Sequence, residues 1–183
     1  MQKKLNYITH FSTFFALTLV FQMGGFPQPI TGPLVNMMLF LTVIHLGLIG
    51  GISLGVLTPL IALWRGQLPA VLAPMIPFIM TGNAMLIFVY KVITIKLKIF
   101  LKSEKGWQNN TRIAIGLIWG ASMKFIVLFI GVKFIVPHIW GIPLPEKLAG
   151  MMATPQLVTA LVGGMLALPV AQLLRKAGIY QNL

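Results

Sequence analysis

The stretch that decides the fold runs from residue 33 to residue 64 and reads PLVNMMLFLTVIHLGLIGGISLGVLTPLIALW. It contains no Asp, Glu, Lys or Arg. A helix that spans a bilayer needs about 20 predominantly apolar residues, and a pair of glycines marks a break in a helix. We therefore predict two helices here, residues 33–49 and a shorter one over residues 52–64, separated at Gly50-Gly51.

The remaining apolar runs extend this pattern along the chain. They predict four further helices, over residues 8–23, 75–95, 113–136 and 154–174. Loops rich in Pro and Gly connect most of them, and residues 96–112 form the one extended polar stretch. The expected fold is an all-α integral membrane protein, a single membrane domain over residues 1–183 built as a bundle of six transmembrane helices. An alternative is that residues 33–64 form one re-entrant hairpin, because only two glycines separate its halves.

The composition points to the same class. Of the 183 residues, 57% are hydrophobic and 9% are charged, whereas about 25% of the residues of a soluble domain are charged. A chain of this size cannot hide so much apolar surface from water, which argues against a soluble enzyme, a secreted module or a disordered tail. The absence of cysteine rules out a disulfide framework and a thiolate metal site.

The net charge of +12 is explained by topology rather than by nucleic-acid binding. Basic residues concentrate on the cytoplasmic side of membrane proteins. One predicted side carries most of them: Lys3, Lys4, Lys96, Lys98, Lys102, Lys105, Arg112, Arg175 and Lys176. The other side carries Arg65 and Lys147. We therefore expect both termini and the polar stretch over residues 96–112 in the cytoplasm.

Lys124 is the most unusual residue, because it is predicted deep in the membrane. At 1.5 Å per residue it lies about 18 Å from the inner end of its helix, too far for its ammonium to reach the interface. The two acids of the chain, Glu104 and Glu146, fall in predicted loops. Three interpretations follow: the amine is neutral, it is held by backbone carbonyls at a kink such as Pro59 or Pro169, or it meets an anionic ligand.

Three amides accompany Lys124 near the predicted outer side. Asn36 and Gln156 fall in the first turns of their helices, and Asn83 lies about 12 Å below the outer start of its helix. Polar groups at such depth are rare and usually functional, so they predict a site for a small polar molecule, with interhelical hydrogen bonding as the alternative. Trp140, in an outer loop, is either an interfacial belt residue or a lid that stacks on the ligand.

Two small residues in the first helix indicate a contact with a partner. Ser12 and Ala16 are four residues apart between bulky phenylalanines, and small residues allow helices in lipid to approach closely. The sequence holds no paired carboxylates, phosphate-binding glycine loop or zinc-binding helix motif. We therefore expect neither an enzyme, a cofactor nor a metal site, and any transport would draw its energy from a partner.

Five segments are distinctive: GPLVN at residues 32–36, LTP at residues 57–59, APMIPFIMTGN at residues 73–83, GASMK at residues 120–124 and TPQLVTA at residues 154–160. Together with the size of the chain and its six predicted helices, they resemble the substrate-binding S component of energy-coupling factor (ECF) vitamin transporters. The resemblance covers essentially the whole chain.

This resemblance implies a multi-pass protein of the prokaryotic plasma membrane that binds a vitamin or related micronutrient near the outer face. The implied partners are a transmembrane coupling subunit and two cytoplasmic ATPases that use ATP, and the S component topples in the membrane to deliver its ligand. Ser12 and Ala16 would contact the coupling subunit, although Val20 departs from the family's run of small residues. The ligand residues expected here are Asn36, Asn83, Lys124, Trp140 and Gln156. The alternative is a structural or assembly subunit of a membrane complex that transports nothing.

Overall fold

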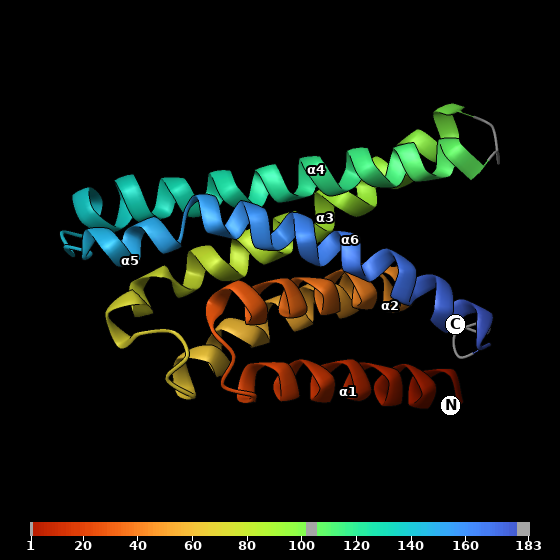
Figure 1. Ribbon diagram of the computed structural model, residues 1–183, viewed down its shortest axis with the longest axis horizontal. Helices are drawn as coiled ribbons and strands as arrows, with labels where there is room; N and C mark the ends of the chain where they lie inside the picture. The colour runs from red at the N-terminus through yellow and green to blue at the C-terminus, as the bar shows by residue number, and fades with distance from the viewer. Residues whose placement is uncertain (1, 102–105, 179–183) are drawn as a thin grey trace.

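A computed structural model describes residues 2–101 and 106–178, and these form helices without a strand. In chain order the helices are α1 (Gln2–Met23), α2 (Gln28–Trp64), the short 3₁₀ helix η1 (Ala70–Met75), α3 (Ile76–Leu101), α4 (Gly106–Ile130), the π-helix η2 (Gly131–Ile139), α5 (Glu146–Met151) and α6 (Thr154–Lys176). Figure 1 shows them as a bundle of long, roughly aligned helices.

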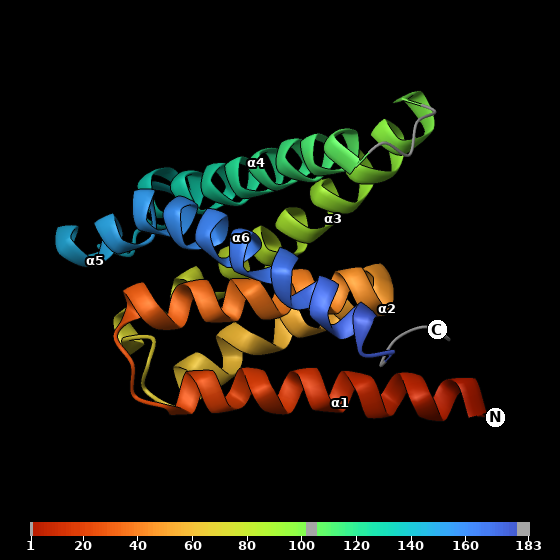
Figure 2. The same cartoon turned by 45° about the vertical axis from the view of Figure 1, so that its right-hand side comes forward.

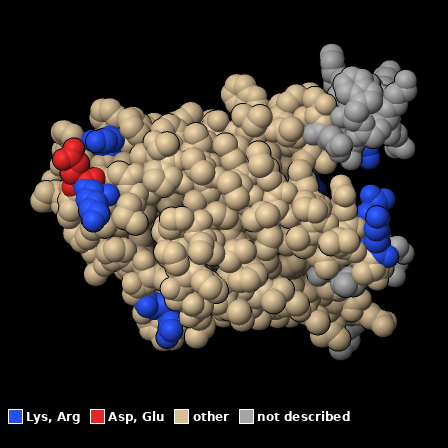
Figure 3. Space-filling model, in the orientation of Figure 1, with Lys and Arg blue, Asp and Glu red and all other residues tan. Residues whose placement is uncertain are grey.

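Several of the described helices have the length and composition of membrane spans. Four segments are long and apolar enough to cross a bilayer: Gln28–Trp64, Ala70–Ile99, Thr111–Ile139 and Glu146–Lys176. On the face drawn in Figure 3, Lys, Arg and the acidic side chains gather at the two ends of the molecule and leave an uncharged band between them. The chain is therefore all-α, with several helices suited to a membrane.

Helix α2 reverses direction, and it does so earlier than the sequence predicts. Its backbone is non-helical at Gly47, where φ is 79°, a left-handed conformation that glycine adopts without strain. A Cβ placed on Gly51 would lie 3.0 Å from the Cβ of Val43, although eight residues of straight helix would separate them by about 12 Å. The predicted break at Gly50-Gly51 is thus wrong in position. These glycines are instead the points where the first arm (residues 28–46) and the second arm (residues 48–64) touch.

Other element boundaries also differ from the prediction. Much of the polar stretch over residues 96–112 is helical, because α3 continues to Leu101 and α4 begins at Gly106. The helix predicted over residues 113–136 widens into the π-helix η2, where the Trp140 amide donates to the Ile135 carbonyl at 3.0 Å. Pro137 lies in this segment and lacks an amide hydrogen, which disfavours a regular α-helical turn.

Glycines bring the central helices into close contact. A Cβ on Gly163 of α6 would lie 2.6 Å from both the Asn36 Cβ and the Pro33 carbonyl oxygen of α2, and one on Gly120 of α4 would lie 2.6 Å from the Leu86 carbonyl oxygen of α3. Helices in lipid associate through such close packing. The contacts hold α6 against α2 and α4 against α3, whereas α1 packs mainly on α2.

The bundle has two distinct ends. At the terminal end, α1 begins and α6 ends, beside the end of α3 and the start of α4 (Figure 1). At the opposite end lie α5 and the connections from α1 to α2 and from α2 to η1 (Figures 1 and 2). We call this the cavity end, because a cavity lined by four of the predicted site residues opens there.

Candidate functional site

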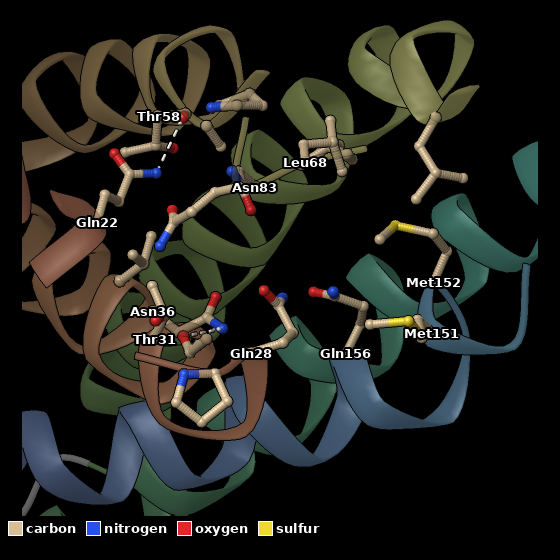
Figure 4. A pocket seen from close by; sticks show the side chains of 18 of the residues that line it. Gln22, Gln28, Thr31, Asn36, Thr58, Leu68, Asn83, Met151, Met152 and Gln156 are labelled. Carbon is tan, nitrogen blue, oxygen red and sulfur yellow. Dashed lines mark hydrogen bonds between the residues drawn. The ribbon is translucent and has the colours of Figure 1, made fainter. Parts of the chain in front are cut away.

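A cavity of about 400 Å³ lies at the cavity end, between α1, both arms of α2, α3, α4 and α6. Four of the five predicted ligand residues line it: Asn36, Asn83, Lys124 and Gln156. All four are buried. They come from four different helical segments, so the fold brings together residues that are distant in sequence. Figure 4 shows several polar side chains around this common space.

Lys124 is the only basic residue among the described residues of the lining, and its side chain is 3% exposed. Its Nζ donates a hydrogen bond of 2.7 Å to Asn36 Oδ1. The stem of Lys124 packs on Gly82, where an added Cβ would lie 3.3 Å from the Lys124 Cγ. The partner of the amine is thus a side-chain amide rather than a backbone carbonyl at Pro59 or Pro169. A neutral amine has two N–H donors and an ammonium has three, so at least one donor remains for a ligand in either state.

Asn36 is held with its oxygen toward Lys124. Its Nδ2 donates to the Gly32 carbonyl at 2.9 Å and to Thr159 Oγ1 at 3.4 Å. The Thr159 hydroxyl in turn donates to the Gln156 carbonyl at 3.1 Å. Because the amide nitrogen is committed to these acceptors, its oxygen is the group left to accept from Lys124. One continuous network therefore joins the first arm of α2 to α4 and α6.

Asn83 is positioned by a proline on the neighbouring helix. In a regular helix, the amide of residue 59 would donate to the carbonyl of Gly55, but Pro59 has no amide hydrogen. Asn83 Nδ2 occupies that acceptor instead, at 2.9 Å. The opposite end of the amide, Asn83 Oδ1, is buried and accepts no hydrogen bond among the described residues.

Gln22 repeats this arrangement from α1. Its Nε2 donates to the Thr58 carbonyl at 3.0 Å, whereas its Oε1 is buried and accepts no hydrogen bond within the described part of the chain. Most buried polar groups in proteins have a partner. Gln22 and Asn83 both line the cavity, so each brings an amide oxygen without a hydrogen bond among the described residues to the cavity wall, while Lys124 brings a donor.

The sequence interpretation missed several polar residues of the lining, namely Gln22, Gln28, Thr31, Thr58 and Gln67. The amides of Gln28 and Gln156 point toward one another in Figure 4. Gln22, Gln28 and Gln67 sit in or beside predicted outer loops, on the side where Asn36 and Gln156 were expected. Their shared position next to these loops is the sequence signal from which they could have been predicted as lining residues.

Trp140 is not among the described residues that line the cavity. Its ring packs on Phe78, with 5.4 Å between the ring centroids, and its side chain is 46% exposed. Contact with a ligand at this position therefore has no support from the geometry of the described cavity.

Ser12 and Ala16 lie on the exposed side of α1. Phe14 and Thr18, between and beyond them, are buried, so α1 turns one face toward the bundle and its small residues away from it. Val20 continues the exposed stripe. This stripe is free to contact another helix.

Comparisons of the chain with family models, curated proteins and solved structures found no match. The chemistry of the cavity is therefore inferred from its lining. The lining combines a buried amine, two buried amide oxygens and apolar walls such as Leu68 and Leu72, a combination that is chemically suited to a small polar molecule. No Asp or Glu is among the described residues of the lining, so the site favours a ligand with an anionic or electron-rich group.

Proposed function

We propose that this chain is the membrane-embedded substrate-binding subunit of an ATP-driven ECF-type importer for a vitamin or related micronutrient. The observation that carries the proposal is the 400 Å³ cavity around Lys124 and Asn36. Sites for small organic ligands typically have volumes of about 300–1,000 Å³, with apolar walls and a few convergent polar groups. The chain itself performs no catalytic step in this proposal and holds no cofactor, since its partners hydrolyse ATP.

The proposed topology has six crossings: α1, the two arms of α2, α3, α4 and α6. An even number of crossings puts both termini on one side, and the start of α1 and the end of α6 lie at the same end of the bundle (Figure 1). The described basic residues at or near that end are Lys4, Lys91, Lys96, Lys98, Arg112, Arg175 and Lys176. Their excess over the opposite end favours a cytoplasmic terminal end. The cavity then faces the outside of a prokaryotic plasma membrane.

The ligand in this proposal carries a carboxylate or phosphate that approaches Lys124. Hydrogen bonds to charged groups are among the strongest available in a protein, and a buried cation without a carboxylate partner gains most from an anion. The oxygens of Gln22 and Asn83 accept from hydroxyl or amine groups on the same ligand. An anionic molecule that also carries hydrogen-bond donors matches these two requirements.

Coupling is proposed through the exposed stripe that includes Ser12 and Ala16 on α1. A transmembrane coupling subunit would lay a helix against it, and two cytoplasmic ATPases would complete the complex. The whole bundle would then topple to release its ligand inward. The uncharged band on the face drawn in Figure 3 favours such a movement, since few charges on that face would have to enter the hydrocarbon.

The ligand is tested by native mass spectrometry of the full chain, purified gently from the membrane. We expect a retained small molecule whose mass and fragmentation identify a carboxylate or phosphate together with hydroxyl or amine groups. A chain that retains nothing, and whose thermal unfolding is unchanged by a panel of vitamins, would contradict the proposal.

Coupling is tested by co-purification with the ATPases. Ala16→Trp places a bulky ring on the α1 stripe, and Ala114→Trp makes the same change at an exposed position of α4. We expect only Ala16→Trp to lose the ATPases. Recovery of a redox or secretion complex in place of the ATPases would instead favour a structural or assembly subunit.

A further inference from the structure

A second cavity, of about 720 Å³, lies at the terminal end between α2, α3, α4 and α6. Its described lining consists of Ile44, His45, Tyr90, Lys91, Thr94, Ile95, Arg112, Ile113, Leu168, Ala171, Gln172 and Arg175. It shares none of these residues with the cavity around Lys124. The proposed vitamin importer has no use for a binding site at this place.

Three cations from three helices line this cavity: Lys91 of α3, Arg112 of α4 and Arg175 of α6. None of the described lining residues is acidic, and the acid Glu104 lies outside the described residues. Like charges repel one another strongly where water is partly excluded. Basic side chains that serve only to anchor helices would spread outward toward the interface, whereas these three border one space.

Arg112 has an unused donor at this site. Its Nε is buried and has no hydrogen-bond partner among the described residues. Arg112 and Tyr90 both line this cavity. Buried guanidinium donors normally meet an acceptor, and the planar fork of arginine matches a phosphate in particular.

The walls of this cavity are of two kinds. Polar side chains, including Thr94 and Gln172, accompany the three cations, whereas Ile44, Ile95 and Leu168 give it apolar surface. A small inorganic ion would leave that apolar surface unused. A phosphate joined to an apolar body would use both kinds of wall.

We propose that the cavity at the terminal end binds a phosphate group, supplied by the headgroup of an anionic phospholipid. Basic pockets between transmembrane helices on the cytoplasmic side bind such headgroups in other proteins. Arg112 and Arg175 hold the phosphate oxygens, and Lys91 adds a third positive charge. The lipid would fasten the four helices around the cavity at the end opposite to the vitamin site.

The test uses native mass spectrometry of the full chain in a neutral detergent, titrated with phosphatidylglycerol, with phosphatidylcholine or with inorganic phosphate. We expect the first phosphatidylglycerol to bind at least about tenfold more tightly than phosphatidylcholine, because the choline cation of phosphatidylcholine is repelled by the three basic side chains and offsets the charge of its phosphate. Arg112→Gln should remove most of this preference. Arg65→Gln, which removes the same charge at an exposed position of the opposite end, should keep it.

Arg175→Gln provides a second variant, because Arg175 is exposed and its loss should not disturb folding. It should weaken phosphatidylglycerol binding several-fold. Equal binding of both lipids, or a preference that survives both arginine changes, would overturn the proposal. Displacement of phosphatidylglycerol by millimolar inorganic phosphate would assign the site to a soluble phosphate compound and overturn the lipid assignment.

Discussion

The two cavities of this bundle use positive charge in opposite ways. At the cavity end, a single lysine with 3% exposure donates to an amide that is itself held by two acceptors. At the terminal end, three basic side chains border a larger space, and each of them is at least partly exposed. The contrast teaches that the number of basic side chains around a cavity is a poor guide to how specifically it binds a ligand. The burial of those side chains and the number of hydrogen bonds they already make are better guides.

The energetic reason lies in solvation. A cation deep in the hydrocarbon costs several kcal/mol unless polar groups replace its water, so Lys124 depends on Asn36 and on any ligand. Cations near the interface keep part of their hydration and are screened by salt. Loss of one charge should therefore matter more at the cavity end than at the terminal end.

The largest effect is expected from Lys124→Met. It removes the only basic side chain among the described residues that line the cavity around Lys124, and loss of a buried charged hydrogen bond costs about 2–5 kcal/mol, so affinity for the co-purified molecule should fall about 100-fold. Lys91→Met removes the same charge at the terminal end and should leave this affinity unchanged. Binding is measured by titration calorimetry with the molecule identified by mass spectrometry.

Folding is checked separately for this pair, because Lys124→Met also leaves Asn36 Oδ1 without its donor. Lys124→Gln keeps a polar side chain and serves as the second variant. Helical circular dichroism and a monomeric elution profile should match the original protein. Unchanged affinity for the co-purified molecule in a folded Lys124 variant would contradict this difference between the two cavities, because the buried lysine would then have a structural role only.

A smaller effect is expected from the pairing of Asn83 with Pro59. Asn83→Ala leaves the Gly55 carbonyl with only the longer hydrogen bond from the Thr58 hydroxyl, at 3.4 Å, and should lower the free energy of unfolding by about 1–3 kcal/mol. Pro59→Ala restores an amide hydrogen that can bond the same carbonyl. In that background, Asn83→Ala should cost about 1 kcal/mol less, as measured by a double-mutant cycle of unfolding in mixed micelles. Equal costs in both backgrounds would show that Asn83 is not there to replace the missing amide.

The smallest effect is expected from salt. Partly exposed charges are screened when the Debye length falls to about 10 Å or less. Raising NaCl from 50 to 300 mM should thus weaken phosphatidylglycerol binding by a few-fold, whereas affinity at the buried Lys124 should change by less than about twofold. Equal salt dependence at the two ends, measured in the same preparation, would remove the distinction between them.

The sequence predicted the residues of the cavity around Lys124 better than their contacts. Asn36, Asn83, Lys124 and Gln156 stand out because polar groups are conspicuous in apolar helices. The hydrogen bond between Asn36 and Lys124 could not be predicted, because the two residues are 88 positions apart and the contact depends on how the helices cross. Likewise, the sequence shows that Pro59 lacks an amide hydrogen, but it does not show that the Asn83 side chain donates to the Gly55 carbonyl in its place.

The position of the reversal in α2 shows a second limit of prediction from a single sequence. Gly47, Gly50 and Gly51 are all able to break a helix, and a single sequence does not tell which of them takes a left-handed φ. That choice follows from packing, because Gly50 and Gly51 are needed where the arms meet and no side chain fits. Trp140 illustrates the same point, since an aromatic residue in a loop is equally suited to a ligand or to Phe78.

The reversal at Gly47 also bears on how the chain enters the bilayer. Its two arms are joined without any polar linker, so no hydrophilic segment has to be moved across the membrane or retained between them. We expect the arms to insert together as one hairpin whose internal contact at Gly51 is made before α3 follows. A bulky side chain at Gly51 would then be felt during biosynthesis, as failed insertion, and not only in the stability of the finished bundle.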